Sequence, residues 1–284
     1  MMDKKVALKK SAKIAGLVLL LFVLTVFFIF PFYAMLSRSL MSDVEIRTTV
    51  RLFPLNISFQ SYLDVFSNAK IAFWLLNTLI IAVINIIGTT FSSSLCAYGF
   101  SKLQFPGRDL CFSLVLATLM LPSIVMQIPL YVIFSDLQWI GTWLPLIVPG
   151  FFGGGAVNIF LMRQFMRGIP NQLAEAASID GAGSFRIYIQ LVMPLCLPIA
   201  IYIVVNTFLG CWNDFMNPLL YLANYESKYN LSLGLYMEFN NVSNAYLAND
   251  IMAAGVMMLL PCLAIFFVFQ RYLIEGVTMT GLKG

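Results

Sequence analysis

Apolar residues fall into six long stretches along the chain, separated by shorter polar segments. A helix needs roughly 20 apolar residues to cross the hydrocarbon core of a bilayer. The pattern therefore predicts an all-α, polytopic membrane protein with six transmembrane helices between residues 14 and 269. The expected spans are Ile14–Leu36, Ala72–Phe100, Leu110–Phe134, Trp143–Met162, Val192–Leu222 and Ile251–Phe269. Lysines precede the first stretch, but its apolar run is too long for a signal peptide and no small-residue cleavage site follows, so we interpret it as a retained span.

Composition supports this interpretation and narrows the chemistry. Of 284 residues, 60% are hydrophobic and 11% charged, with a mean hydropathy of +0.87. A soluble domain is about half apolar and a quarter charged. Histidine is absent, so the commonest metal ligand and general base are missing. The five cysteines form no C-x-x-C pair, which predicts small buried side chains and no metal site.

The basic residues predict how the chain lies in the membrane. With six spans, twelve lysines and arginines fall on one side and five on the other. The richer side is expected to be cytoplasmic, and the spread of charge over several loops does not suggest a nucleic-acid surface. The cytoplasmic parts would then be the N-terminal tail 1–13, the 2–3 loop, the 4–5 loop 163–191 and the C-terminal tail 270–284. Their basic residues are Lys4, Lys5, Lys9, Lys10, Lys13, Lys102, Arg108, Arg163, Arg167, Arg186, Arg271 and Lys283.

The 4–5 loop has the pattern of two short helices joined by a turn. Pro170 suits the first turn of a helix over 171–178. Gly181 and Gly183 would end that helix, and Ser184 could cap a second one. Its alanines would allow close approach by another surface, and the charges of Glu175, Asp180 and Arg186 would fix the register. The alternative is an ordinary solvated connection.

Residues 175–183, Glu-Ala-Ala-Ser-Ile-Asp-Gly-Ala-Gly, followed by Met-Pro-Leu at 193–195, closely resemble the EAA loop of ABC importer permeases. The resemblance implies the type I ABC importer permease fold and a coupling helix that sits in a cleft of the ATPase subunit. The D-G-A form resembles the carbohydrate-uptake branch. Met193 departs from the usual leucine, a volume-conserving change. The ATPase-coupling residues that the resemblance implies are Glu175, Ala176, Ala177, Asp180, Gly181, Ala182 and Gly183.

Three further segments carry the same resemblance over most of the chain after residue 72. Residues 212–219 are similar to the W-N-[DE]-F-x-x-P-L segment of span five in that branch. Residues 98–108 are similar to its loop with F-P-G-[RK], and residues 270–278 to the tail of the six-span partner in the maltose system.

Uncharged polar residues inside the spans suggest a solute pathway. In span five they recur every three or four residues, which places them on one helical face, and two asparagines share a face of span two. Amides beside aromatic rings such as Trp212, Tyr221 and Tyr225 suit a sugar. The candidate pathway residues are Asn77, Asn85, Asn206, Gly210, Trp212, Asn213 and Asn217. The alternative is that the asparagines only link helices, at about 0.6 kcal/mol each.

The sequence of span four predicts an irregular backbone. Gly153, Gly154 and Gly155, with Pro145 and Pro149, favour a bend or a close helix contact. A gate hinge is the other interpretation.

The sequence contains no G-x-x-x-x-G-K-[ST] phosphate loop, so we expect no enzyme activity and no cofactor in this chain; ATP and Mg²⁺ would bind to a partner ATPase. The resemblance implies a heterodimer with a second permease subunit, two ATPase subunits, and an extracytoplasmic solute-binding protein contacted by loop 223–250. We expect a sugar importer in the bacterial plasma membrane with both termini cytoplasmic. The alternatives are an ABC permease for glycerol phosphate, a uronate oligomer or a polyamine, an ion-coupled secondary transporter, and a non-transporting membrane scaffold.

Overall fold

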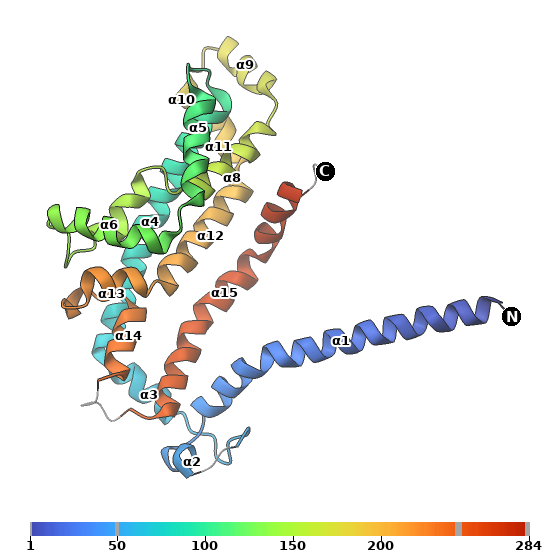
Figure 1. The fold of residues 1–284 in the computed structure, drawn as a ribbon, viewed down its shortest axis with the longest axis vertical. Coiled ribbons are helices and arrows are strands. Elements are labelled where there is room, and N and C mark those ends of the chain that lie inside the picture. The colour runs from blue at the N-terminus through green and yellow to red at the C-terminus, as the bar shows by residue number, and fades with distance from the viewer. Residues whose placement is uncertain (1, 49–50, 242–245, 282–284) are drawn as a thin grey trace. The chain divides into compact units, whose positions relative to one another are not determined.

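A computed structural model describes the backbone of residues 2–48, 51–241 and 246–281 and the side chains of 13–48, 51–68, 70–241 and 246–272 (Figure 1). Within these residues every regular element is a helix, as the apolar pattern predicted. The side chains of the lysines at 4–10 and of the tail motif after 272, and all of Lys283, lie outside the described part. The chain forms two compact units, residues 1–68 with 241–261 and residues 69–240 with 262–284.

The first unit contains α1 (Met2–Ser39), α2 (Asp43–Thr48), α3 (Gln60–Ser67) and the start of α15 (Ala248–Gly281). The Ser37 hydroxyl donates to the Leu52 carbonyl, and the Asn249 side-chain amide donates to the Met41 carbonyl. These bonds fold the segment after α1 back onto the unit. All side chains from 13 to 32 are exposed, as expected for a helix that faces lipid.

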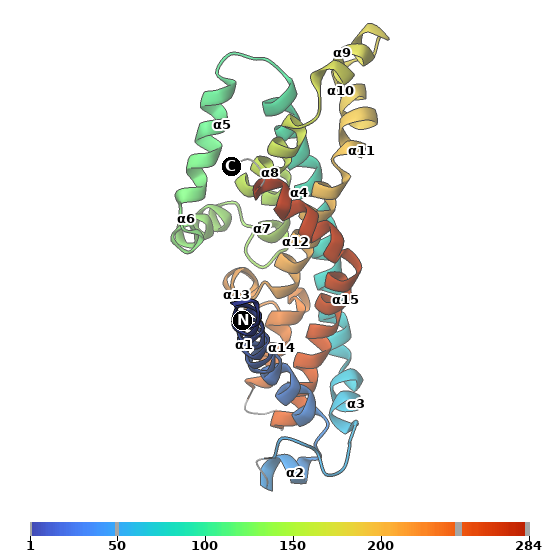
Figure 2. The same cartoon turned by 90° about the vertical axis from the view of Figure 1, so that its right-hand side faces the viewer.

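The second unit is organised around α4 (Ala69–Lys102). Helices α8 (Ala156–Arg167) and α12 (Leu197–Asn213) pack against it, and α14 (Leu231–Phe239) lies along its first half (Figures 1 and 2). Ser93, Ser94 and Ala97 of α4 are fully buried, and their small size lets the neighbouring helices approach closely.

Among the described residues, four helices are long and apolar enough to cross a membrane, and up to six spans result if each of two bent pairs counts as one. The first bent pair corresponds to predicted span three. Its first half is α5 (Arg108–Ala117) extended by η1 (Thr118–Met120), and its second half is α6 (Ser123–Asp136). The two halves are bent by 103° before Pro122. Predicted span five is the second bent pair, bent by 79° at Cys196. Proline cannot continue the hydrogen-bond ladder of a helix, which accounts for breaks beside Pro122 and Pro198.

Shorter elements complete the second unit. Before α8 lie α7 (Leu144–Ile147) and η2 (Val148–Phe151). Span five begins with α10 (Ser184–Ile187), a π-helical turn over Tyr188–Val192 and α11 (Met193–Leu195), and α9 (Asn171–Ile179) precedes it. After α12 come α13 (Met216–Leu222) and η4 (Glu226–Lys228).

Span four bends as the sequence predicted. Gly153, Gly154 and Gly155 have φ of 87°, 63° and 92°, a region that favours glycine. A Cβ added to Gly154 would lie 2.5 Å from the carbonyl oxygen of Thr89 in α4. The bend and the close helix contact are therefore confirmed, and a gating role stays a hypothesis.

The predicted tail boundaries do not coincide with helix ends. α1 already begins at Met2, and α15 continues to Gly281. Hydropathy marks where apolar residues stop, whereas lysine, alanine and leucine all favour helix, so both helices extend into the charged segments.

Candidate functional site

The predicted coupling segment forms a helix, a glycine turn and a second helix. α9 begins after Pro170 and ends at Ile179. The amides of Gly181 and Ala182 donate to the carbonyls of Ser178 and Ala177 at 3.0 and 2.9 Å, which is the Schellman pattern of a helix C-terminus. This pattern needs a left-handed residue, and Gly181 supplies it with φ of 82°.

Gly183 and Ser184 differ from the expectation. Gly183 has φ of −70° and itself occupies the N-cap of α10, with no side-chain cap. Ser184 is the first helical residue, so the predicted serine cap is wrong. The π-helical turn that follows shifts the register of this helix, which the sequence pattern did not show.

The end of α4 holds the coupling segment at both ends. Lys102 Nζ donates to the Ile169 carbonyl at 2.6 Å and to Asn171 Oδ1 at 2.9 Å, just before and at the start of α9. The Tyr98 hydroxyl donates to the Ser184 carbonyl at 3.0 Å, at the start of α10. Tyr98 and Lys102 belong to the segment whose sequence resembles the family loop, so two separate motifs meet in one place.

The coupling segment also exposes large apolar side chains; the sequence indicated Leu173 as part of an apolar helix edge, but not Ile179 or Phe185. Leu173, Ile179 and Phe185 are 44%, 87% and 60% exposed. Ala177 and Ala182 pack against the core of the unit, whereas Glu175, Ala176, Asp180, Gly181 and Gly183 are exposed. The sequence signal that could have identified this apolar surface is the presence of large apolar residues in an otherwise polar loop. Such a cluster marks a surface that another protein covers.

On α12, three of the candidate pathway residues share an exposed face. Asn206, Gly210 and Asn213 are all exposed. The face ends at Asn213, because Asp214 has extended backbone angles and stops the helix. Asn217 lies on α13, where its amide donates to both oxygens of the Asp214 carboxylate at 3.0 and 3.2 Å. The predicted continuation of the face to Asn217 is therefore wrong.

The remaining candidates on α4 and α12 are buried. The Asn77 amide donates to the Tyr229 carbonyl at 2.8 Å, and the Asn85 amide donates to the Leu146 carbonyl at 2.9 Å. Trp212 is 2% exposed and stacks on Phe208. In this conformation Asn77 ties α4 to the segment that follows η4, and Asn85 ties it to α7.

This placement predicts different effects for two asparagines. Asn77→Ala removes a donor from a buried carbonyl and should lower the free energy of unfolding by about 1–3 kcal/mol. Asn206→Ala removes an exposed amide and should change it by less than about 0.5 kcal/mol. Thermal unfolding of the two purified variants checks this, and equal melting temperatures would contradict it.

The external segment predicted at 223–250 is partly packed. The Tyr225 ring covers Gly141, where a Cβ would lie 2.5 Å from it. Tyr221 is buried. Tyr229 is also buried and donates to the Ala223 carbonyl. Burial, and after it the Glu226 charge, raises the pKa of the Tyr229 hydroxyl. Tyr236 is 48% exposed and remains available to a partner; residues 242–245 lie outside the described part.

Comparison with known proteins places this arrangement in a family. Residues 90–279 match the family described as binding-protein-dependent transport system inner membrane component. The chain is 32% identical to the arabinooligosaccharides transport system permease protein AraQ of Bacillus subtilis, over 95% of both chains. It is 31% identical to the maltose/maltodextrin transport system permease protein MalG of Escherichia coli, over 74% of this chain and 72% of that one.

A solved structure has the same fold. A chain in the crystal structure of a bacterial ABC transporter involved in the import of the acidic polysaccharide alginate superposes with a TM-score of 0.83 at 23% identity, covering 92% of this chain and 97% of that chain. The predicted ABC importer permease fold is thereby confirmed, and the family match covers the coupling segment. The chain belongs to the family of binding-protein-dependent transport system inner membrane components.

Proposed function

We propose that this chain is a transmembrane permease subunit of an ATP-driven importer that moves an oligosaccharide across the bacterial plasma membrane. The observation that carries the proposal is the exposed coupling segment, anchored by Lys102 and Tyr98 to α4. A rigid connection of this kind lets a force applied to the segment move the membrane helices as a body.

Leu173, Ile179 and Phe185 would make the apolar contact with a separate ATPase subunit. The charges of Glu175 and Asp180 would set its register. ATP and Mg²⁺ would be bound by that subunit, because this sequence has no phosphate loop. A second permease subunit would complete the pathway and a second ATPase subunit would engage its own coupling loop, so that ATP-driven closure of the ATPase pair moves both loops.

An oligosaccharide is the cargo that the relatives' names favour, since they include permeases for arabinooligosaccharides and maltodextrins. The exposed amides of Asn206 and Asn213 on α12 offer uncharged hydrogen-bond partners on one face, as neutral hydroxyl-rich solutes require. The positive-inside distribution supports cytoplasmic termini and a cytoplasmic coupling segment. The segment 223–250 would then face the solute-binding protein, with Tyr225 and Tyr236 as its exposed aromatic residues among those described.

The test is reconstitution of the complete importer in nanodiscs with its binding protein. ATP hydrolysis is measured with arabino-, galacto- and malto-oligosaccharides, a uronate oligomer and glycerol phosphate. Neutral oligosaccharides should stimulate hydrolysis only when the binding protein is present. Stimulation by the anionic solutes alone would overturn the choice of cargo, and hydrolysis indifferent to the binding protein would overturn the importer function.

A further inference from the structure

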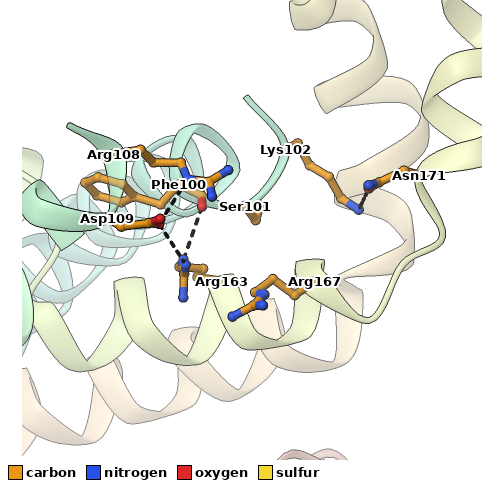
Figure 3. Close-up of a pocket in the computed structure, with 8 residues that line it drawn as sticks. All are labelled: Phe100, Ser101, Lys102, Arg108, Asp109, Arg163, Arg167 and Asn171. Carbon is orange, nitrogen blue, oxygen red and sulfur yellow. Dashed lines mark hydrogen bonds and ion pairs between the residues drawn. The ribbon is translucent and has the colours of Figure 1, made fainter. Parts of the chain in front are cut away.

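A strongly basic pocket of about 540 Å³ lies where α4 ends, α5 begins, α8 ends and α9 begins (Figure 3). All of these elements belong to the second compact unit. Four basic side chains surround the pocket and only one carboxylate accompanies them. The lining residues are Phe100, Ser101, Lys102, Arg108, Asp109, Arg163, Arg167 and Asn171.

Arg163 is fixed at the base of this basic pocket. It is 7% exposed, its Nε donates to the Phe100 carbonyl at 3.1 Å, and its guanidinium carbon lies 3.8 Å from the centre of the Phe112 ring. Its nearest carboxylate oxygen, Asp109 Oδ1, is 4.0 Å away. A buried charge normally needs a close partner, and here the partner is distant and shared.

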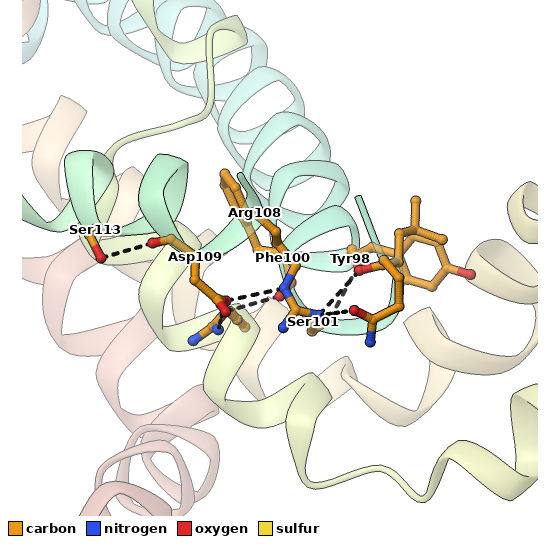
Figure 4. Close-up of polar contacts among 9 residues, drawn as sticks. Tyr98, Phe100, Ser101, Arg108, Asp109 and Ser113 are labelled. Atoms are coloured by element: carbon orange, nitrogen blue, oxygen red, sulfur yellow. Dashed lines mark hydrogen bonds and ion pairs between the residues drawn. The ribbon is translucent and has the colours of Figure 1, made fainter. Parts of the chain in front are cut away.

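The Asp109 carboxylate also forms an ion pair with Arg108. Arg108 Nε donates to Asp109 Oδ1 at 3.2 Å, and its Nη1 donates to Gln104 Oε1 and the Leu103 carbonyl (Figure 4). One carboxylate therefore serves two guanidinium groups. The remaining bonds of Arg108 go to neutral oxygens, which hold its position without cancelling its charge.

Among the described side chains, the other two basic groups meet no carboxylate. Lys102 donates only to the neutral oxygens of Ile169 and Asn171. Arg167, one helical turn after Arg163, is exposed and forms no hydrogen bond or ion pair within the described part of the chain. Like charges gathered in this way repel one another, and an anion in the pocket would relieve that repulsion.

The position of the basic pocket indicates where such an anion comes from. It lies at the ends of two membrane-spanning helices, and exposed apolar residues flank it on α5, with Leu110 67% and Leu114 61% exposed. A phospholipid has a phosphate at this level and acyl chains that cover an apolar flank. Basic pockets between transmembrane helices on the cytoplasmic side bind anionic headgroups.

We propose that the basic pocket binds the phosphate of an anionic phospholipid, through Arg167 and Arg163 with Lys102 at its edge. A soluble phosphate ester shares this chemistry but makes no use of the apolar flank. Because Lys102 also bonds Asn171 at the start of α9, the bound lipid would sit beside the anchor of the coupling segment. The proposal does not depend on the solute that is carried.

The test uses the assembled importer in nanodiscs of phosphatidylcholine with a minor fraction of phosphatidylglycerol. After extraction, native mass spectrometry measures the phosphatidylglycerol retained. An ion pair between an exposed arginine and a phosphate bound beside it contributes up to about fivefold to affinity, and only a side chain that lines the basic pocket makes this contact. Arg167→Gln should therefore lower retention up to about fivefold, and Arg167→Glu should lower it further. Both replace an exposed side chain, so folding should be unaffected, and thermal unfolding checks this.

Lys13→Gln is the matched control, because Lys13 is exposed, lies on the same predicted membrane face and is outside the basic pocket. Its retention should equal that of the unmodified chain. Unchanged retention in both Arg167 variants, or an equal loss in Lys13→Gln, would overturn the proposal. In discs of phosphatidylcholine alone, calorimetry with inorganic phosphate forms the second arm. If the unmodified chain binds inorganic phosphate, Arg167→Glu abolishes that binding, and no phosphatidylglycerol is retained in the first arm, then soluble phosphate is the ligand instead of a lipid.

Discussion

Replacing Gly181 with proline is expected to abolish ATP-driven transport while the membrane helices stay folded. The turn after α9 needs φ near 82° at this position, and the proline ring fixes φ near −65°. Proline also removes the amide that donates to the Ser178 carbonyl at 3.0 Å. A cost of about 3 kcal/mol would make the ordered turn about a hundredfold less populated, so the segment could no longer transmit motion.

The matched control is Gly183→Ala, two residues further along the same turn. Gly183 has φ of −70° and no heavy atom of this chain within 4 Å of an added Cβ, so alanine should leave the turn folded and retain far more transport than the Gly181→Pro variant. Uptake by proteoliposomes, ATP hydrolysis and thermal unfolding are measured for both variants. Full substrate-stimulated transport by the Gly181→Pro variant would show that this turn does not couple the subunits.

The two glycines illustrate what the sequence could predict and what it could not. The helix over 171–178 and its glycine stop followed from local propensities, and the structure confirms them. The sequence treated Gly181 and Gly183 alike, because either can adopt the left-handed conformation. Only the hydrogen bonds of the finished turn assign that conformation to Gly181.

The spans show the same limit. Apolar runs located α4 within a few residues, because a continuous helix needs only length and hydrophobicity. They did not locate the bend before Pro122 or the helix end at Asp214, since the apolar run continues past both positions, and length and hydrophobicity alone do not mark a break. Asn217 was misplaced for this reason, as its expected face assumed that α12 continued.

The candidate pathway residues fall into a buried group and an exposed group, and a single sequence does not reveal which residue belongs to which. Asn77 and Asn206 are both asparagines within predicted spans, yet one is bonded to a buried carbonyl and the other is exposed. What separates them is the position of the segment 227–230, which comes from a distant part of the chain. A polar side chain within a membrane span usually faces another polar group or a water-filled cavity, and only the fold shows which of these it faces.

Replacing Gly154 with alanine is expected to destabilise the second unit more than any other glycine-to-alanine change in span four. An added Cβ would lie 2.5 Å from the Thr89 carbonyl oxygen and 3.0 Å from its Cα. These are backbone atoms of α4, so no side-chain rotation relieves the contact. The left-handed backbone costs about 1–2 kcal/mol for alanine and overpacking about 1–3 kcal/mol more.

Gly155→Ala separates these two costs. Gly155 also has a positive φ, 92°, with ψ of 142°, but nothing lies within 4 Å of an added Cβ, so only the backbone cost of about 1–3 kcal/mol applies. Gly99→Ala, on α4 with ordinary helical geometry and open space, should be stabilising by up to about 1 kcal/mol. Thermal unfolding should therefore order the melting temperatures as Gly99→Ala, Gly155→Ala and Gly154→Ala, from highest to lowest. If Gly154→Ala melts with Gly155→Ala, the contact with Thr89 yields easily, and a hinge between α7 and α8 becomes the better explanation of the three glycines.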